Sequence, residues 1–218
     1  MTSKLVKVKI GFSNEWGDAI EALANFSSSL EQMEVSYAKF IRQDIQYAKM
    51  KHLSIVLKRV LPVVPLIRAY PNLRSLELTV GGSNGLAFRG DRIMTMMGHR
   101  YRSINELSQL KGGWEVLDYV QSGIPELYVL GLSCTIHYLD VYLSEIRETH
   151  ELCDILGDCH PSTLRIRAQK LDKTDIENIA RIIPLDLDHF ILSIDLSSYS
   201  PDEACDMLVG RFCQLFDR

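Results

Sequence analysis

The chain has 218 residues, of which 46% are hydrophobic and 24% charged, as is typical of one soluble domain. Its formal net charge of -4 disfavours a surface built to attract nucleic-acid phosphates or anionic lipid. No run approaches the roughly 20 apolar residues that span a bilayer, and the start lacks the layout of a secretory signal. We expect an intracellular protein, cytoplasmic or nuclear, with neither nucleic-acid nor membrane partners.

Cysteine usage agrees with an intracellular location. An odd number of cysteines in a chain of this length does not predict a disulfide framework. Free cysteine in an apolar helical context packs as a small hydrophobic residue. The five cysteines are Cys134, Cys153, Cys159, Cys205 and Cys213.

One short pattern, apolar-x-x-apolar-x-apolar, recurs along the chain, and its cleanest copy is Leu73, Leu76 and Leu78. Apart from one gap, the middle residues of successive copies lie 20 to 26 positions apart, close to the roughly 20 to 29 residues of a leucine-rich repeat. The middle residues of the seven copies are Val8, Met33, Leu53, Leu76, Leu139, Leu164 and Phe190.

The last two apolar positions of each copy alternate on a short strand and face the same side. One strand cannot bury such a row alone, but stacked strands backed by returning segments can. The sequence therefore predicts an α/β leucine-rich-repeat solenoid over residues 1–218. It would have parallel strands on its concave face, helices on its convex face, and about seven irregular repeats. An ordinary α/β domain with evenly spaced strands is the alternative.

The returning segments are predicted to be helical. Residues 16–26 carry apolar side chains at the spacing of an amphipathic helix. Capping boxes at Thr174–Glu177 and Ser200–Glu203 predict two further helix starts. The predicted helices cover 174–183 and 201–216.

The regular spacing fails between Leu76 and Leu139. We interpret residues 81–113 as an insertion that forms a long loop, with a short helix over 103–110. After it, 114–120 is predicted to be helical, and 127–132 allows an extra strand before that of Leu139. The register of the repeats around 114–141 stays open.

Three segments, Pro71–Leu78, Leu127–Leu132 and Tyr138–Val141, resemble the leucine-rich regions of fungal-type F-box proteins. In that family the repeats receive a substrate, and a separate F-box docks the adaptor of a cullin-type ubiquitin ligase. This sequence begins directly in the first repeat and has no F-box-like three-helix segment. The resemblance implies a substrate-holding adaptor and leaves the ligase role open.

The predicted register turns alternate strand residues toward the concave face, where they are chemically mixed. Tyr138, Asp140 and Tyr142 are the best candidates for a recognition anchor, because aromatic residues beside polar groups often carry interface energy. Ordinary exposed strand residues are the alternative interpretation. The other predicted partner-binding residues on this face are Glu77, Arg165, Arg167 and His189.

The insertion is a second candidate contact surface, since it is locally basic in an acidic chain. Long loops on rigid scaffolds often carry function, although a solvated excursion is the alternative. Its predicted partner-binding residues are Arg89, Arg92, Arg100 and Arg102.

The sequence contains no recognisable catalytic motif, so we predict a protein that is not an enzyme and needs no cofactor. The nearest approach to a metal site has a spacing that matches no common structural zinc site, and we predict no metal. Its residues are His150, Cys153, Cys159 and His160.

Two functional interpretations follow from these observations. The first is a protein–protein interaction module, an adaptor suited to substrate recognition in an F-box-type ubiquitin ligase. The second is a small α/β ligand-binding or nucleotide-binding domain, or an enzyme, in which Gly81–Gly85 would contact a phosphate.

Overall fold

The eight strands form one parallel sheet, in which each strand is hydrogen-bonded to the strands next to it in chain order. The computed structural model describes residues 4–13, 17–57, 62–80, 92–144, 148–169, 171, 173–184, 186–195 and 197. Within this part, β1 and β8 are the edge strands and the sheet does not close on itself. The strands are β1 Lys7–Gly11, β2 Gln32–Ser36, β3 His52–Leu57, β4 Ser75–Val80, β5 Val116–Gly123, β6 Thr135–Leu143, β7 Thr163–Ala168 and β8 His189–Ile194.

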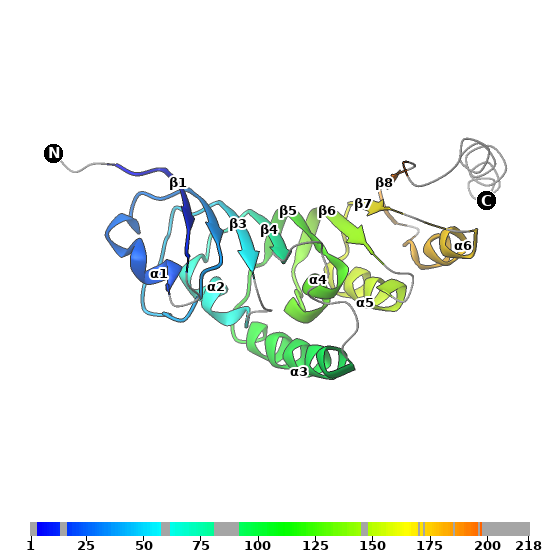
Figure 1. The fold of residues 1–218 in the computed structure, drawn as a ribbon, viewed down its shortest axis with the longest axis horizontal. Coiled ribbons are helices and arrows are strands. Elements are labelled where there is room, and N and C mark those ends of the chain that lie inside the picture. The colour runs from blue at the N-terminus through cyan, green and yellow to red at the C-terminus, as the bar shows by residue number, and fades with distance from the viewer. Residues whose placement is uncertain are drawn as a thin grey trace.

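The helices lie on one side of the sheet, and the row of strands bends gently away from them at both ends (Figure 1). We call the opposite side of the sheet, which none of the described helices covers, the open face. The longest helix, α3, lies farthest from the strands, beyond α2 and α4 (Figure 1). The helices are α1 Ala19–Ala22, a 3-10 helix Ala24–Phe26, α2 Val64–Ala69, α3 Arg92–Gln109, α4 Ile124–Leu130, α5 Thr149–Cys159 and α6 Lys173–Ile182.

The predicted register of the strands is confirmed. Except between Leu76 and Leu139, the middle apolar residue of each predicted copy pairs with that of the next. Val120 fills this gap, since it pairs with Leu76 on one side and Leu139 on the other. The repeat pattern therefore identified seven of the eight strands.

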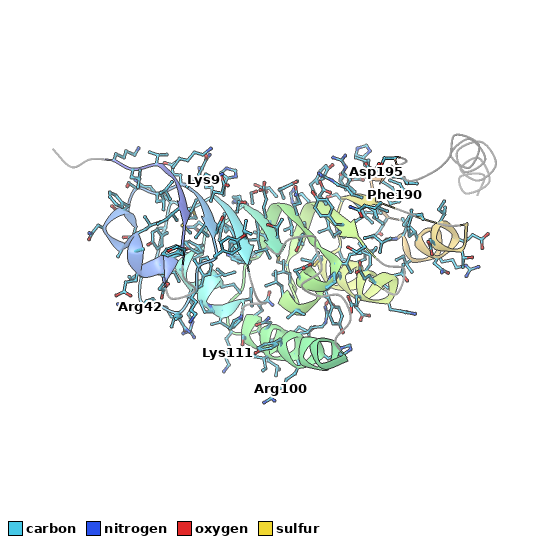
Figure 2. The ribbon with its side chains drawn as sticks, viewed as in Figure 1. Lys9, Arg42, Arg100, Lys111, Phe190 and Asp195 are labelled. Atoms are coloured by element: carbon cyan, nitrogen blue, oxygen red, sulfur yellow. The ribbon has the colours of Figure 1, made fainter. Side chains whose placement is uncertain are left out.

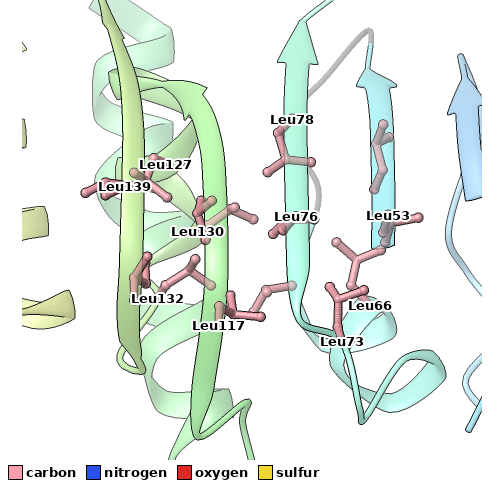
Figure 3. Close-up of a cluster of buried hydrophobic side chains, with 14 of the residues drawn as sticks. Leu53, Leu66, Leu73, Leu76, Leu78, Leu117, Leu127, Leu130, Leu132 and Leu139 are labelled. Carbon is pink, nitrogen blue, oxygen red and sulfur yellow. The ribbon is translucent and has the colours of Figure 1, made fainter. Parts of the chain in front are cut away.

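The core lies between the sheet and the helices. Leu53, Leu76, Leu117 and Leu139 point from the strands into this layer and are at most 1% exposed. They meet side chains of α2 and α4, among them Leu66, Leu127 and Leu130 (Figure 3). The edge strands are less well covered, and Val8 and Phe190 are only partly buried.

The structure corrects two predictions between Gly113 and Leu132. Residues 114–120, predicted as a helix, contain the start of β5, and 127–132, considered as a strand, lie mostly in α4. Trp114, Leu117 and Val120 follow each other at intervals of three, which also fits one side of a helix, and Ser122 breaks the strand pattern. A short, continuous apolar run such as 127–132 does not distinguish a buried strand from a buried helix.

The start and end of α4 are nevertheless marked in the sequence. Pro125 stands at the beginning of the helix, and Gly131 follows its last residue in a left-handed conformation, with φ 53°. A Cβ atom at Gly131 would lie 3.2 Å from the Arg102 carbonyl oxygen, and together with the positive φ this close approach favours glycine here.

The prediction of a long loop over 81–113 is also wrong for most of that segment. Residues 81–91 lie outside the described part, but Arg92–Gln109 forms the 18-residue helix α3, of which the predicted helix 103–110 is only the end. In the part of α3 whose side chains the structure describes, the most deeply buried side chains are polar, so apolar periodicity does not identify the packed side of the helix. Asn105 is 0% exposed and Gln109 6%.

These polar side chains hold the carboxyl end of α4, where carbonyl groups have no partner within the helix. Asn105 donates from Nδ2 to the Val129 oxygen at 2.8 Å, and Gln109 donates from Nε2 to the Gly131 oxygen at 2.6 Å. Arg102 donates to the Tyr128 oxygen at 2.9 Å. The α3 helix thus acts as a side-chain cap for α4.

Of the predicted convex helices, the one over 174–183 is confirmed as α6. The one over 16–26 is shorter than predicted, with α1 and the 3-10 helix in its place. The predicted helix over 201–216 lies outside the described residues. Among the helices that the structure describes, none combines the length and hydropathy needed to cross a membrane.

Two tyrosines in the core give the fold a sensitivity to alkaline pH. The rings of Tyr47 and Tyr70 lie 5.4 Å apart, and both residues are 0% exposed. Burial raises the pKa of Tyr47 to about 12 and raises the pKa of Tyr70 well above its usual value near 10. The folded state therefore favours the neutral phenols, and their contribution to stability is complete below about pH 10.

We expect the free energy of unfolding to fall as pH rises from about 10 toward 12, because the unfolded chain releases these protons first. Urea titrations at several pH values, with tyrosinate absorbance recorded in parallel, measure this loss. The Tyr70 hydroxyl has no hydrogen-bond partner among the described residues, so Tyr70→Phe is expected to keep stability at pH 7 and to flatten the alkaline slope. An unchanged slope would contradict this assignment.

Candidate partner-binding surface

The open face is lined by the alternate strand residues that point away from the helices. In β6, Leu139 and Val141 enter the core, so Tyr138, Asp140 and Tyr142 belong to the open face. The sheet register places Tyr138 beside Thr163, Asp140 beside Arg165, and Tyr142 beside Arg167. The predicted residues of β6 and β7 are therefore neighbours.

Strand β5 adds two residues that sequence reasoning did not identify, Tyr119 and Gln121. Tyr119 pairs with Tyr138, and their rings lie 5.6 Å apart at an interplanar angle of 37°. The Tyr119 hydroxyl donates to Oε1 of Gln121 at 2.6 Å. Both were missed because 114–120 was predicted as a helix. The glycines at 112 and 113, together with β-branched and aromatic residues after them, were the available signal for a strand.

A chain of hydrogen bonds joins the three strands. Gln121 donates from Nε2 to the Tyr142 hydroxyl at 3.1 Å, and Arg167 donates to the same hydroxyl at 2.8 Å. The guanidinium carbon of Arg167 lies 5.0 Å from the centre of the Tyr142 ring, and the other end of the guanidinium is ion-paired with Asp140. We call this group the tyrosine cluster, and its members are Tyr119, Gln121, Tyr138, Asp140, Tyr142 and Arg167.

Asp140 lies at the base of the cluster and is only 1% exposed. Its Oδ2 atom accepts from Arg167, while its Oδ1 atom has no hydrogen-bond partner among the described residues. The hydrogen bond to Asp140 raises the pKa of Arg167. Because a buried carboxylate is stable only when it is paired, Asp140 holds Arg167 in place rather than meeting a partner itself.

Around the cluster stand the other predicted residues of this face. Arg165 donates from Nε to the Ser193 hydroxyl at 3.2 Å, and His189 is exposed on β8. Glu77 is half-buried on β4 and pairs in register with Gln121. Burial, followed by the negative charges of Asp140 and Glu77, raises the pKa of Tyr119 to about 12, so its hydroxyl stays protonated and remains a donor at neutral pH.

Among the predicted basic residues of 81–113, those whose side chains the structure describes lie on α3 and not on the open face. Arg100 is exposed on α3, on the helix side of the molecule, whereas Lys9 and Phe190 mark the strand side (Figure 2). Arg102 is 9% exposed, and it forms ion pairs with Glu106 at 2.6 Å and with Asp158. Arg89 lies outside the described residues, as does the side chain of Arg92. Arg100 and the tyrosine cluster are thus on opposite sides of the molecule, so the described basic residues of this segment do not form one site with the open face.

The residues of the weak metal pattern do not converge. No group of three or more histidine, cysteine or acidic side chains suited to a metal occurs in the described part of the chain. Cys159 is buried and donates to the Leu132 oxygen at 3.2 Å, and burial raises the pKa of its thiol. Cys153 is exposed on the outer side of α5, so the burial expected of a free cysteine in an apolar helical context does not hold for it.

The open face thus offers aromatic rings, hydroxyl groups and guanidinium groups that are already oriented by one another. Such a surface is suited to holding a polypeptide by ring contacts and hydrogen bonds. Comparisons with protein-family models, with curated proteins and with solved structures found no match to this chain.

Proposed function

We propose that the chain is a leucine-rich-repeat solenoid that serves as an adaptor and binds a protein partner on its open face. Sequential strand order, a single row of repeated apolar residues and helices on one side support the solenoid. A doubly wound nucleotide-binding sheet shares parallel strands and intervening helices, but it usually reverses its strand order and is covered on both faces. The order of these eight strands favours the solenoid.

The observation that carries the binding role is the tyrosine cluster. Tyrosine and arginine are enriched among residues that dominate interface energy. Here the ion pair of Arg167 with Asp140 and its contact with Tyr142 fix the side chains before a partner arrives. Such pre-organisation reduces the entropy lost on binding.

Within this proposal, the resemblance to F-box leucine-rich regions assigns the partner the role of a substrate for a ubiquitin ligase. The open face would hold that substrate, and a separate F-box would dock the ligase. Recovery of a separate F-box protein and its cullin adaptor together with the partner, from cells that express this chain, is the expected result. A partner recovered without any ligase component would limit the function to that of a general adaptor.

The proposal is tested by comparing captured proteins between matched variants. Tyr138→Ala and Arg165→Ala alter the open face, whereas Arg181→Ala removes an exposed arginine from α6. Loss of one interface anchor commonly costs more than about 1.4 kcal/mol, or tenfold in affinity. We expect recovery of the partner to fall at least about tenfold for the open-face variants and to be unchanged for Arg181→Ala.

Quantitative mass spectrometry after affinity enrichment provides this measurement. A partner whose recovery is unchanged by both open-face substitutions would contradict the proposed binding surface. The alternative prediction, a phosphate-contacting loop at Gly81–Gly85, falls on residues outside those that the structure describes.

A further inference from the structure

At the carboxyl-terminal end of α3, three apolar side chains are exposed on the outer side of the helix, which is the reverse of the usual arrangement for a helix packed on a protein. Ile104 is 45% exposed, Leu107 is 63% exposed, and Leu110, in the turn after the helix, is 81% exposed. Intervals of three residues place these side chains on one side of the helix, over about 9 Å of its length. We call these three residues the α3 stripe.

The orientation of α3 is fixed by the contacts on its other side. Asn105 accepts from the Val63 amide at the start of α2 at 3.0 Å and donates to the Val129 oxygen at the end of α4. Gln109 and Arg102 bind the neighbouring carbonyl groups of α4. Rotation of the helix to bury its apolar side would break all of these bonds. The α3 stripe is therefore held outward by the fold itself.

The charges beside the α3 stripe are positive. Arg100 and Lys111 are exposed on the same side of the helix, and both point away from the body of the protein (Figure 2). The carboxylate of the helix, Glu106, lies toward the other side and is ion-paired with Arg102 at 2.6 Å. A partner that covers the stripe would thus meet two cations at its ends and no described carboxylate between them.

We propose that the α3 stripe binds an amphipathic helix of another protein whose polar flanks are acidic. The apolar side of that helix would cover Leu107 and its neighbours, and its carboxylates would pair with Arg100 and Lys111. Pairing of an apolar stripe with an apolar stripe removes water from both, and opposite charges at the rim set the orientation. This surface is separate from the open face and does not depend on the proposed adaptor role.

Other occupants are less compatible with these charges. Two copies of this chain that met through the stripe would bring the cations of one copy beside those of the other, in either orientation, and like charges at an interface are unfavourable. Membrane-surface helices bind through larger apolar areas and more basic residues than the three apolar side chains and two cations that the described part of this surface provides.

Photo-cross-linking in cells tests this proposal. A photoreactive residue replaces Leu107 in the full chain, and the same residue at Ile41 is the control, since Ile41 is 61% exposed and also apolar. We expect adducts at position 107, above the Ile41 background, that map to an acidic segment with apolar residues at helical spacing. The double substitution Arg100→Glu with Lys111→Glu is expected to reduce these adducts at least about tenfold without lowering the thermal midpoint.

A synthetic peptide of the mapped segment should bind the purified chain and lose affinity by the same factor in the charge-reversed variant. Adducts with lipid, with this chain itself or with segments that lack net negative charge would overturn the proposal. Adducts whose yield is no higher than at Ile41, or whose yield is unchanged in the charge-reversed variant, would also overturn it. Tyr138→Ala is expected to leave the adducts unchanged, so failure of the open-face proposal and failure of this one are distinguishable.

Discussion

Leu117→Ala is expected to lower the free energy of unfolding by about 3–5 kcal/mol. Leu117 is 0% exposed and points from β5 toward leucines of α4 and of the neighbouring strands (Figure 3). Truncation removes apolar contacts and leaves a cavity at the middle of the sheet, where strands on both sides prevent collapse. Urea denaturation of the full chain measures the change.

The matched control is Leu107→Ala, the same substitution at a side chain that is 63% exposed on α3. Substitutions at such surface positions usually change stability by no more than about 0.5 kcal/mol. Equal losses for the two variants would mean that Leu117 is not part of the core. The pair of variants therefore tests whether β5 places Leu117 in the core.

Asn105→Ala is expected to lower the free energy of unfolding by about 2–4 kcal/mol. The Asn105 side chain is 0% exposed, accepts from the Val63 amide and donates to the Val129 oxygen, so it links the start of α2 to the end of α4. Without it, one backbone donor and one backbone acceptor remain buried and unpaired, and each such group costs about 1–3 kcal/mol.

Asn72→Ala serves as the control, because Asn72 also donates to a carbonyl oxygen, that of Ala48 at 2.8 Å, but does so at the surface. Water can replace that hydrogen bond, and we expect the free energy of unfolding to fall by less than about 1 kcal/mol. Amide exchange at Val63 should accelerate in the Asn105 variant alone. Comparable losses in the two variants would show that Asn105 is not a buried link.

The sequence was informative where burial follows a simple period. The row from Val8 to Phe190 was predictable because a parallel sheet with one covered face repeats its inward residues in register. Strand β5 escaped detection because Ser122 occupies an inward position, and this serine is 0% exposed. A serine at this position removes one of the three apolar residues that define the apolar-x-x-apolar-x-apolar pattern.

The helix α3 shows a second reason for failure. Periodicity methods assume that the apolar side of a helix faces the protein, whereas α3 buries Asn105 and Gln109 and exposes Leu107. Its packing is dictated by the unpaired carbonyl groups of α4, which belong to another segment of the chain. Only the three-dimensional arrangement reveals that these carbonyl groups need hydrogen-bond donors from α3.

The candidate site was partly predictable for the same reasons. Tyr138, Tyr142 and Arg167 were placed correctly on one face, because alternation along β6 and β7 is regular. The burial of Asp140 was not predictable, since it depends on the side chains of the neighbouring strands, among them Arg167 of β7, which is ion-paired with its carboxylate. Tyr119 and Gln121 could be found only once β5 was known.

Sequential strand order also decides how this protein would respond to a pulling force. Each strand is bonded only to its neighbours in the chain, so the sheet has no strand that ties its two ends together. A load applied across the described strands passes through their ladders in series, so every ladder bears the same force, and the less well covered edges at β1 and β8 are expected to yield first. We therefore expect the strands to detach one after another from the edges of the sheet under such a load.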